Sequence, residues 1–209
     1  MDLMKLYDRL YGFFGPQHWW PGDSPLEIMI GAVLTQNTNW QNVEKAISNL
    51  KEARLMDLES LYNVPAQSLA EYIRPAGYYN IKSVRLKHLI VFVKENYGSI
   101  EKMFEEETEI LREKLLAVKG LGPETVDSIL LYAGNKPIFV VDAYTKRIFS
   151  RHNLCFEDVD YHELQSEIMA SLPKDLDLYN EFHALIVRLG KDYCKKRNPL
   201  CEKCPINGF

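Results

Sequence analysis

The turn Lys119-Gly120-Leu121-Gly122, which separates two helical patterns, most restricts the fold of this 209-residue chain. Gly120 and Gly122 let the backbone turn tightly, because glycine lacks a Cβ and readily reaches positive φ. Pro123 stands early in the next helix, where its missing N–H costs little. Backbone N–H groups at such a helix start attract anions, including DNA phosphates. The segment therefore predicts two helices joined by an anion-binding turn.

Helical periodicity extends over most of the chain. Ser24 and Glu27 have the spacing of a capping box, with Pro25 at the first helical position and an apolar run up to Leu34. Further helices are expected around 43–50 and over 57–63, 66–73, 79–96, 108–118, 123–133, 143–151, 160–171 and 177–192. Strand-like alternation is nearly absent, and the apolar run 138–141 is interpreted as a buried connector. The sequence predicts an all-α protein.

Length and charge narrow the class of protein further. The chain is 46% hydrophobic, enough for one substantial core or two small lobes, and it has no apolar run near the roughly 20 residues of a membrane span. Without a signal-peptide pattern, we expect a soluble, cytoplasmic protein. The net charge of −4 argues against a protein that coats DNA indiscriminately. Acidic side chains gather in 101–113, which predicts a solvated face, whereas a local basic cluster can contact phosphates. That cluster comprises Arg188, Lys191, Lys195, Lys196 and Arg197.

Three of the four cysteines gather near the C-terminus. Cys194, Cys201 and Cys204 have the spacing Cys-x6-Cys-x2-Cys in a segment rich in Lys, Arg and Pro. In a cytosolic protein, such clustering favours a metal site over a disulfide. Thiolate ligands suit zinc or an iron–sulfur cluster. Cys155 lies apart from the others and is expected to be a small buried hydrophobic residue.

Asp142 follows the apolar run and precedes the helical pattern 143–151. By itself it can be explained as an N-cap. This segment resembles the helix-hairpin-helix module of the endonuclease III superfamily of DNA glycosylases. The resemblance lies in the tight turn, in the spacing from Gly122 to Asp142 and in Val140-Val141, which directly precede Asp142. The resemblance covers nearly the whole chain. It implies a six-helix lobe over about 22–135, a second lobe from 1–21 plus 136–209, and damaged double-stranded DNA across the cleft.

The resemblance gives Asp142 a catalytic role that is compatible with capping. Removal of a base builds oxocarbenium character on the sugar, which a nearby carboxylate stabilises, and the same carboxylate can orient or deprotonate the attacking water. Bifunctional members carry a Schiff-base lysine two residues beyond the second hairpin glycine. Glu124 occupies that position here, and Lys119 lies before the turn. We therefore expect a monofunctional enzyme without lyase activity.

The resemblance also assigns DNA contacts and a cofactor. The residues expected to contact DNA are Gln36, Lys119, Gly120, Leu121, Gly122, Glu124, Thr125 and Lys191. The family pattern for a [4Fe–4S] cluster continues with a fourth cysteine, which would fall at position 210, whereas the sequence ends at Phe209. Either the sequence was cut one residue short, or the cluster is incomplete, or the loop has lost it. An intact cluster would be structural and would brace the basic loop against DNA.

The tryptophans point to one branch of this superfamily. Three segments are similar to segments of the 3-methyladenine DNA glycosylase III branch. They are His18-Trp19-Trp20-Pro21, the run from Leu34 to Trp40, and Arg74-Pro75-Ala76-Gly77-Tyr78-Tyr79-Asn80. By this resemblance, Trp20 and Trp40 would sandwich the flipped base near Trp19, and Gln36 would fill the gap left in the duplex. Electron-rich indoles suit a cationic alkylated purine. Leu185 replaces a lysine that this branch can place near the pocket. Ordinary core packing of the tryptophans and a local capping role for Gln36 are the structural alternatives.

Three functions fit these patterns. The first is monofunctional excision of alkylated purines in base excision repair. The second is removal of mismatched thymine or uracil, because such branches also replace the lysine. The third is a non-enzymatic damage binder that kept the fold, although a pure binder has no reason to keep Asp142. We expect the protein to act as a monomer. His183 is interpreted as a structural residue of the last helix.

Overall fold

The computed structural model describes residues 2–208, which form helices and loops without a β-strand. The all-α prediction is confirmed. The chain divides into two compact units: unit 1 comprises Met1–Trp20 and Asn135–Phe209, and unit 2 comprises Pro21–Gly134. Among the described residues, no helix is long and apolar enough to cross a membrane.

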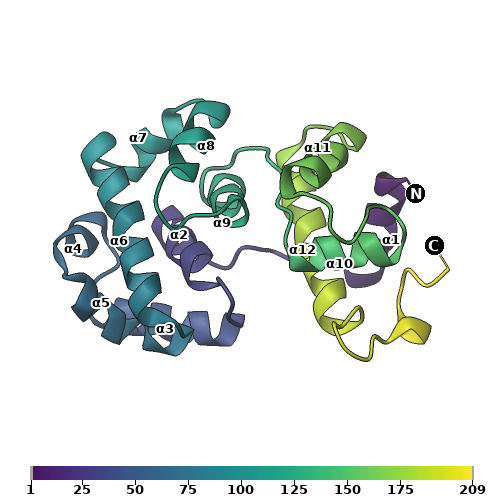
Figure 1. Cartoon of the computed structure of the whole chain (residues 1–209), viewed down its shortest axis with the longest axis horizontal. Helices are drawn as coiled ribbons and strands as arrows, with labels where there is room; N and C mark the ends of the chain where they lie inside the picture. Colours follow the sequence, from purple (N-terminus) through teal and green to yellow (C-terminus); the bar gives the residue numbers. More distant parts are fainter. Residues whose placement is uncertain (1, 209) are drawn as a thin grey trace. The chain divides into compact units, whose positions relative to one another are not determined.

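Unit 2 is built around α2 (Pro25–Leu34), which packs against α3 (Trp40–Glu52), α6 (Tyr79–Asn96), α9 (Pro123–Ser128) and the π-helical turn η2 (Ile129–Ala133) (Figure 1). Buried residues occur on every side of α2, as expected for a central helix. The remaining elements are α4 (Leu58–Asn63), α5 (Ala66–Tyr72), the 3-10 turn η1 (Arg74–Ala76), α7 (Ile100–Glu105) and α8 (Thr108–Leu116).

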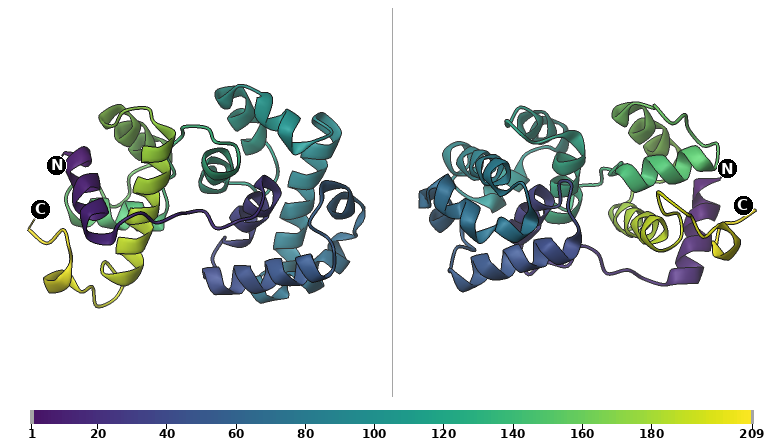
Figure 2. Two further views of the ribbon diagram at one scale, coloured as in Figure 1. Left: turned by 180° about the vertical axis from the view of Figure 1, so that it is seen from behind. Right: turned by 60° about the horizontal axis from the view of Figure 1, so that its bottom comes forward.

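Unit 1 contains α1 (Leu3–Phe14), α10 (Ala143–Arg151), α11 (Tyr161–Ser171), α12 (Leu176–Asp192) and the 3-10 turn η3 (Cys201–Lys203). Helices far apart in the sequence meet in this unit, since α1 and α10 both pack along α12 (Figure 2). Gly190 allows a close approach between α10 and α12, because a Cβ there would lie 2.3 Å from Cδ1 of Tyr144.

Local capping explains where several helices begin. The Ser24 Oγ atom accepts a hydrogen bond from the backbone N–H of Glu27 at 3.2 Å, as the capping-box spacing predicts. The reciprocal bond differs from the prediction, because the Glu27 carboxylate accepts from the N–H of Asp23 at 3.3 Å and pairs with Lys51 at 3.0 Å. Aspartates cap α4, α10, α11 and α12. A side-chain oxygen at each N-cap satisfies N–H groups that have no partner within the helix.

Candidate functional site

The hairpin of unit 2 connects α8 to α9. Gly120 has φ of 96°, and the N–H of Leu121 donates to the carbonyl of Val118 at 3.1 Å, which closes the turn. Gly122 is the N-cap of α9 and offers no side-chain acceptor to the helix start. Lys119, Gly120, Gly122 and Glu124 are exposed, whereas the side chains of Leu121 and Thr125 are both 6% exposed and pack inward.

Gln36 lies against this hairpin. Its Nε2 donates to Oγ1 of Thr125 at 2.9 Å and to the carbonyl of Gly120 at 3.5 Å. Its Oε1 accepts from Nη1 of Arg85, on α6, at 2.5 Å. The fold thus brings together three of the residues expected to contact DNA, Gln36, Gly120 and Thr125. Arg85, to which no sequence motif points, joins them. Only its spacing from Lys82 and His88 along α6 could have suggested it.

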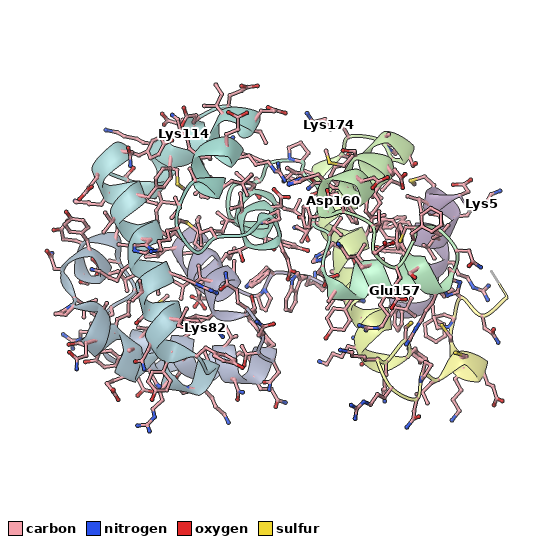
Figure 3. The ribbon with its side chains drawn as sticks, in the orientation of Figure 1. Lys5, Lys82, Lys114, Glu157, Asp160 and Lys174 are labelled. Atoms are coloured by element: carbon pink, nitrogen blue, oxygen red, sulfur yellow. The ribbon has the colours of Figure 1, made fainter. Side chains whose placement is uncertain are left out.

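Lys82 is a buried lysine of α6 to which no sequence motif points either (Figure 3). Its Nζ donates to the carbonyl of Leu34 at 2.8 Å and to that of Ala76 at 2.7 Å. It therefore binds the C-terminal ends of α2 and η1, where helix carbonyls lack partners within the helix. Burial, with a smaller contribution from the charge of Arg85, lowers the pKa of Lys82 to about 8.

The predicted base-pocket tryptophans are divided between the units. Trp40 begins α3 in unit 2 and is half-buried. Trp19 and Trp20 belong to unit 1, where their ring centroids lie 5.1 Å apart with the planes tilted by 47°. Both are half-buried rather than members of the core. Leu185, at the position of the branch lysine, is fully buried in α12.

Asp142 is the N-cap of α10, but capping engages only one of its oxygens. Oδ1 accepts from the backbone N–H of Thr145 at 2.7 Å and from its Oγ1 at 2.8 Å. Oδ2 instead lies 3.7 Å from Nε2 of the buried His183. Burial by itself would raise the pKa of Asp142, but interaction with the nearby His183, together with the bonds from Thr145, holds that pKa below its usual value. The carboxylate is therefore ionised at neutral pH.

The predicted ligand cysteines lie in the segment that follows α12. Cys194 is buried, and its Sγ accepts from Nη1 of Arg151 at 3.3 Å. Cys204 is half-buried and Cys201 exposed. Burial raises the pKa of the Cys204 thiol, and electrostatic interaction with Cys194 and Cys201 adds to the rise. Within residues 2–208, no three Cys, His, Asp or Glu side chains are already arranged around a metal position.

The donor set nevertheless fits an iron–sulfur cluster by its chemistry, because clustered thiolates are its usual ligands. The described residues supply three such thiolates. Cys155, expected to be buried, is only half-buried and burial raises the pKa of its thiol. Its exposure differs from the prediction because it lies in the loop between α10 and α11 rather than on a helix face that packs in the core.

The segment after α12 that contains Cys194, Lys195 and Lys196, called the basic loop, is bound to α10. Arg147 Nε donates to the carbonyl of Cys194 at 2.8 Å, and Arg151 donates to the carbonyls of Lys195 and Lys196 at 2.8 and 3.2 Å. The side chains of Lys195 and Lys196 remain exposed, as does that of Lys191 in the last turn of α12. The loop thus presents cations to solvent while arginines hold its backbone.

Two family models match this chain. The model described as "HhH-GPD superfamily base excision DNA repair protein" matches residues 30–174. The model described as "Iron-sulfur binding domain of endonuclease III" matches residues 194–209. The second match covers the cysteine segment identified from the sequence.

Individual proteins agree with these models. A protein of Methanocaldococcus jannaschii named "Putative DNA repair glycosylase MJ1434" is 48% identical over 99% of this chain and 94% of its own length. A similar fold occurs in the crystal structure of the H. pylori 3-methyladenine DNA glycosylase MagIII bound to 1,N6-ethenoadenine. The two chains share 34% sequence identity and a TM-score of 0.79, over 91% of this chain and 98% of that one. A non-covalent complex of endonuclease III with DNA has a TM-score of 0.83 at 23% identity, covering 97% and 91% of the two chains, and supports the fold.

The hairpin, the aspartate-capped helix that follows it and the cysteine segment thus occur in one all-helical chain whose sequence matches this family over more than half its length. The chain belongs to the HhH-GPD superfamily of base excision DNA repair proteins and is a DNA glycosylase.

Proposed function

We propose that this protein is a monofunctional DNA glycosylase that hydrolytically removes alkylated purines such as 3-methyladenine. The observation that carries the proposal is a buried Asp142 whose Oδ1 is engaged by Thr145 while Oδ2 is not, in a chain that bears Glu124 in place of a Schiff-base lysine. A carboxylate cannot form a Schiff base, so water is the nucleophile left for base removal. The 34% identity to MagIII supports an alkylated purine as the substrate.

Asp142 would act through Oδ2, since Oδ1 is engaged by Thr145. This carboxylate would stabilise positive charge that develops on the sugar and would orient the attacking water. Trp19, Trp20 and Trp40 would receive the extruded base, because indole faces attract cationic alkylated purines. Such a base is already a good leaving group, so no strong general acid is required.

DNA would be bound through the hairpin residues and the basic loop. Lys119 is exposed at the turn, and Lys191 is exposed near the loop whose backbone Arg147 and Arg151 hold. Cys194, Cys201 and Cys204 would bind a [4Fe–4S] cluster that fixes this loop. Phosphate contacts of this kind make DNA affinity fall as salt is raised. We propose a monomer acting on damaged double-stranded DNA in the cytoplasm.

Incubation with DNA treated with a simple methylating agent, followed by chromatography of the released bases, tests the proposal. We expect release of 3-methyladenine without strand nicking, and loss of release in Asp142→Asn. Asp160→Asn is the matched control, because Asp160 caps α11 in the same unit and accepts from the N–H of His162 at 2.8 Å. Nicking without added base, or borohydride trapping of the enzyme on DNA, would overturn the monofunctional assignment.

Removal of mismatched thymine or uracil is the alternative, and duplexes with G·T and G·U pairs test it in the same experiment. Release from these pairs without release of alkylated purines would replace the proposed substrate. If Asp142→Asn retained full product yield, the assignment of Asp142 as the catalytic residue would be wrong.

A further inference from the structure

Both ends of the Gln36 side-chain amide are held within unit 2. The carbonyl oxygen accepts from Arg85 at 2.5 Å, and the amide nitrogen donates to Thr125 at 2.9 Å. The two atoms differ chemically, since one is only an acceptor and the other only a donor. Arg85 and Thr125 therefore fix the orientation of this amide as well as its position.

One face of α6 supplies this support at three successive turns. Lys82 binds the carbonyl of Leu34, two residues before Gln36, at 2.8 Å. Arg85 binds the Gln36 side chain itself, and Nδ1 of His88 lies 2.9 Å from the carbonyl of Lys119 in the hairpin. Residues three apart on a helix lie on the same face. The same helix thus contacts the base of the Gln36 segment, Gln36 itself and the hairpin.

Arg85 also packs on the hairpin glycine. A Cβ on Gly120 would lie 2.4 Å from Cγ of Arg85, so the aliphatic part of the arginine occupies the space that glycine leaves. The Arg85 side chain is half-buried. Its stem therefore contacts the turn while its guanidinium binds Gln36, which links the two segments through one side chain.

A glutamine that enters a duplex must lose its rotamer freedom. A side chain already held in one orientation loses less on binding, which is the general advantage of preorganisation. We propose that Arg85 is a positioning residue that holds Gln36 in the orientation from which it enters the gap left by the extruded base. Arg85 thereby makes Gln36 and the hairpin act together on DNA. This inference rests on the proposed glycosylase function and on the gap-filling role that the resemblance gives Gln36.

A double-mutant cycle tests the coupling. Arg85→Met keeps the stem that covers Gly120 but removes the guanidinium, and Gln36→Leu removes the amide. We expect each variant to lower the single-turnover rate of base release about tenfold, the loss expected for one charge-assisted hydrogen bond. The double variant should be no slower than Gln36→Leu, because Arg85 acts through Gln36. Arg85→Lys, which retains a cationic donor, should recover part of the rate.

Lys94→Met is the matched control, since it removes the same charge from α6 and breaks the pair of Lys94 with Glu59. It should leave the rate unchanged. Additive losses in the double variant would overturn the proposal, because they would mean that Arg85 contacts DNA independently. A faster Arg85→Met enzyme would also overturn it, because Arg85 would then restrain Gln36 from entering the duplex. Equal thermal unfolding temperatures establish that each variant is folded.

A second readout does not require base release. The probe is a duplex with a tetrahydrofuran abasic analogue beside 2-aminopurine, whose fluorescence responds to stacking of a side chain into the gap. Wild type should change this fluorescence, whereas Arg85→Met and Gln36→Leu should show the same reduced change. If wild type releases no alkylated purine but this pattern appears, the proposed substrate is wrong and the role of Arg85 stands. If wild type and Arg85→Met change the fluorescence equally, the role of Arg85 is wrong.

Discussion

Oδ2 of Asp142 lies 3.7 Å from Nε2 of His183, and both side chains are buried in unit 1. Thr145 occupies the other carboxylate oxygen, so His183 faces the oxygen that we assign to catalysis. His183 comes from α12 and Asp142 from the start of α10, two helices that pack together. This pair gives His183, interpreted from the sequence as structural, a contact with the proposed catalytic carboxylate.

Replacing His183 should shift the acid side of the pH–rate profile. In His183→Phe, burial still raises the pKa of Asp142 while the histidine that opposes it is gone, so the carboxylate becomes protonated at a higher pH. The rate of base release should then begin to fall at a higher pH than in wild type. His183→Gln, which keeps a donor but not a charge, should fall between the two. An exposed-site control, His162→Phe, should retain the wild-type profile.

The same pair predicts how stability depends on pH. Because the folded pKa of Asp142 lies below its usual 3.8, this group stabilises the folded protein above that pH and loses its contribution as the pH falls below it. Urea unfolding over the acid range should therefore show a steeper loss of stability in wild type than in Asp142→Asn. Equal slopes would mean that Asp142 does not titrate below its usual pH.

The two hairpin glycines should differ in their tolerance of alanine. Gly120 has φ of 96°, and a Cβ at this position would clash with the Arg85 side chain. Gly122 has φ of −94°, and a Cβ there would meet open space. We expect Gly120→Ala to lower the free energy of unfolding by about 1–2 kcal/mol through backbone strain. Gly122→Ala should change it by less than about 0.5 kcal/mol. Chemical denaturation of both variants measures the difference, and equal losses would contradict the assigned turn geometry.

Lys82→Met should destabilise unit 2 and alter its pH dependence. The variant leaves the carbonyls of Leu34 and Ala76 without their lysine partner, at a cost of about 1–3 kcal/mol for each buried group. Because the folded pKa of Lys82 is about 8 against 10.5 for an ordinary lysine, the unfolded state binds more protons between these values. Wild type should therefore gain stability relative to the variant as the pH rises through that range. A difference that stays constant with pH would contradict the lowered pKa.

Iron and sulfide analysis of anaerobically purified protein tests the cysteine segment. We expect bound iron and sulfide, with visible absorbance that is lost in Cys194→Ala and Cys204→Ala. Cys155→Ala is the control and should keep the chromophore, since Cys155 lies outside the segment matched by the iron–sulfur model. Stoichiometric zinc in place of iron would overturn the cluster assignment.

Local sequence was sufficient for many of the helices. The expected range 79–96 coincides with α6, where periodic apolar residues suffice without a side-chain cap. The range 143–151 coincides with α10, where Asp142 caps the first turn. The predicted helix 123–133 instead divides into α9 and a π-helical turn, since its residues from Thr125 onward are buried on every side and packing sets their hydrogen bonding. The sequence analysis gave no helix range for the segments that form α1 and α7.

The sequence by itself determined the hairpin, the N-cap Asp142, the cysteine segment and the helical class, because each depends on residues close together in the chain. Only the tertiary structure decided which side chains meet. Arg85 binds Gln36 from 49 positions away, and Thr125 does so from 89. His183 reaches Asp142 because α10 and α12 pack together around Gly190. Such contacts depend on how helix faces pack, which spacing along the chain does not specify.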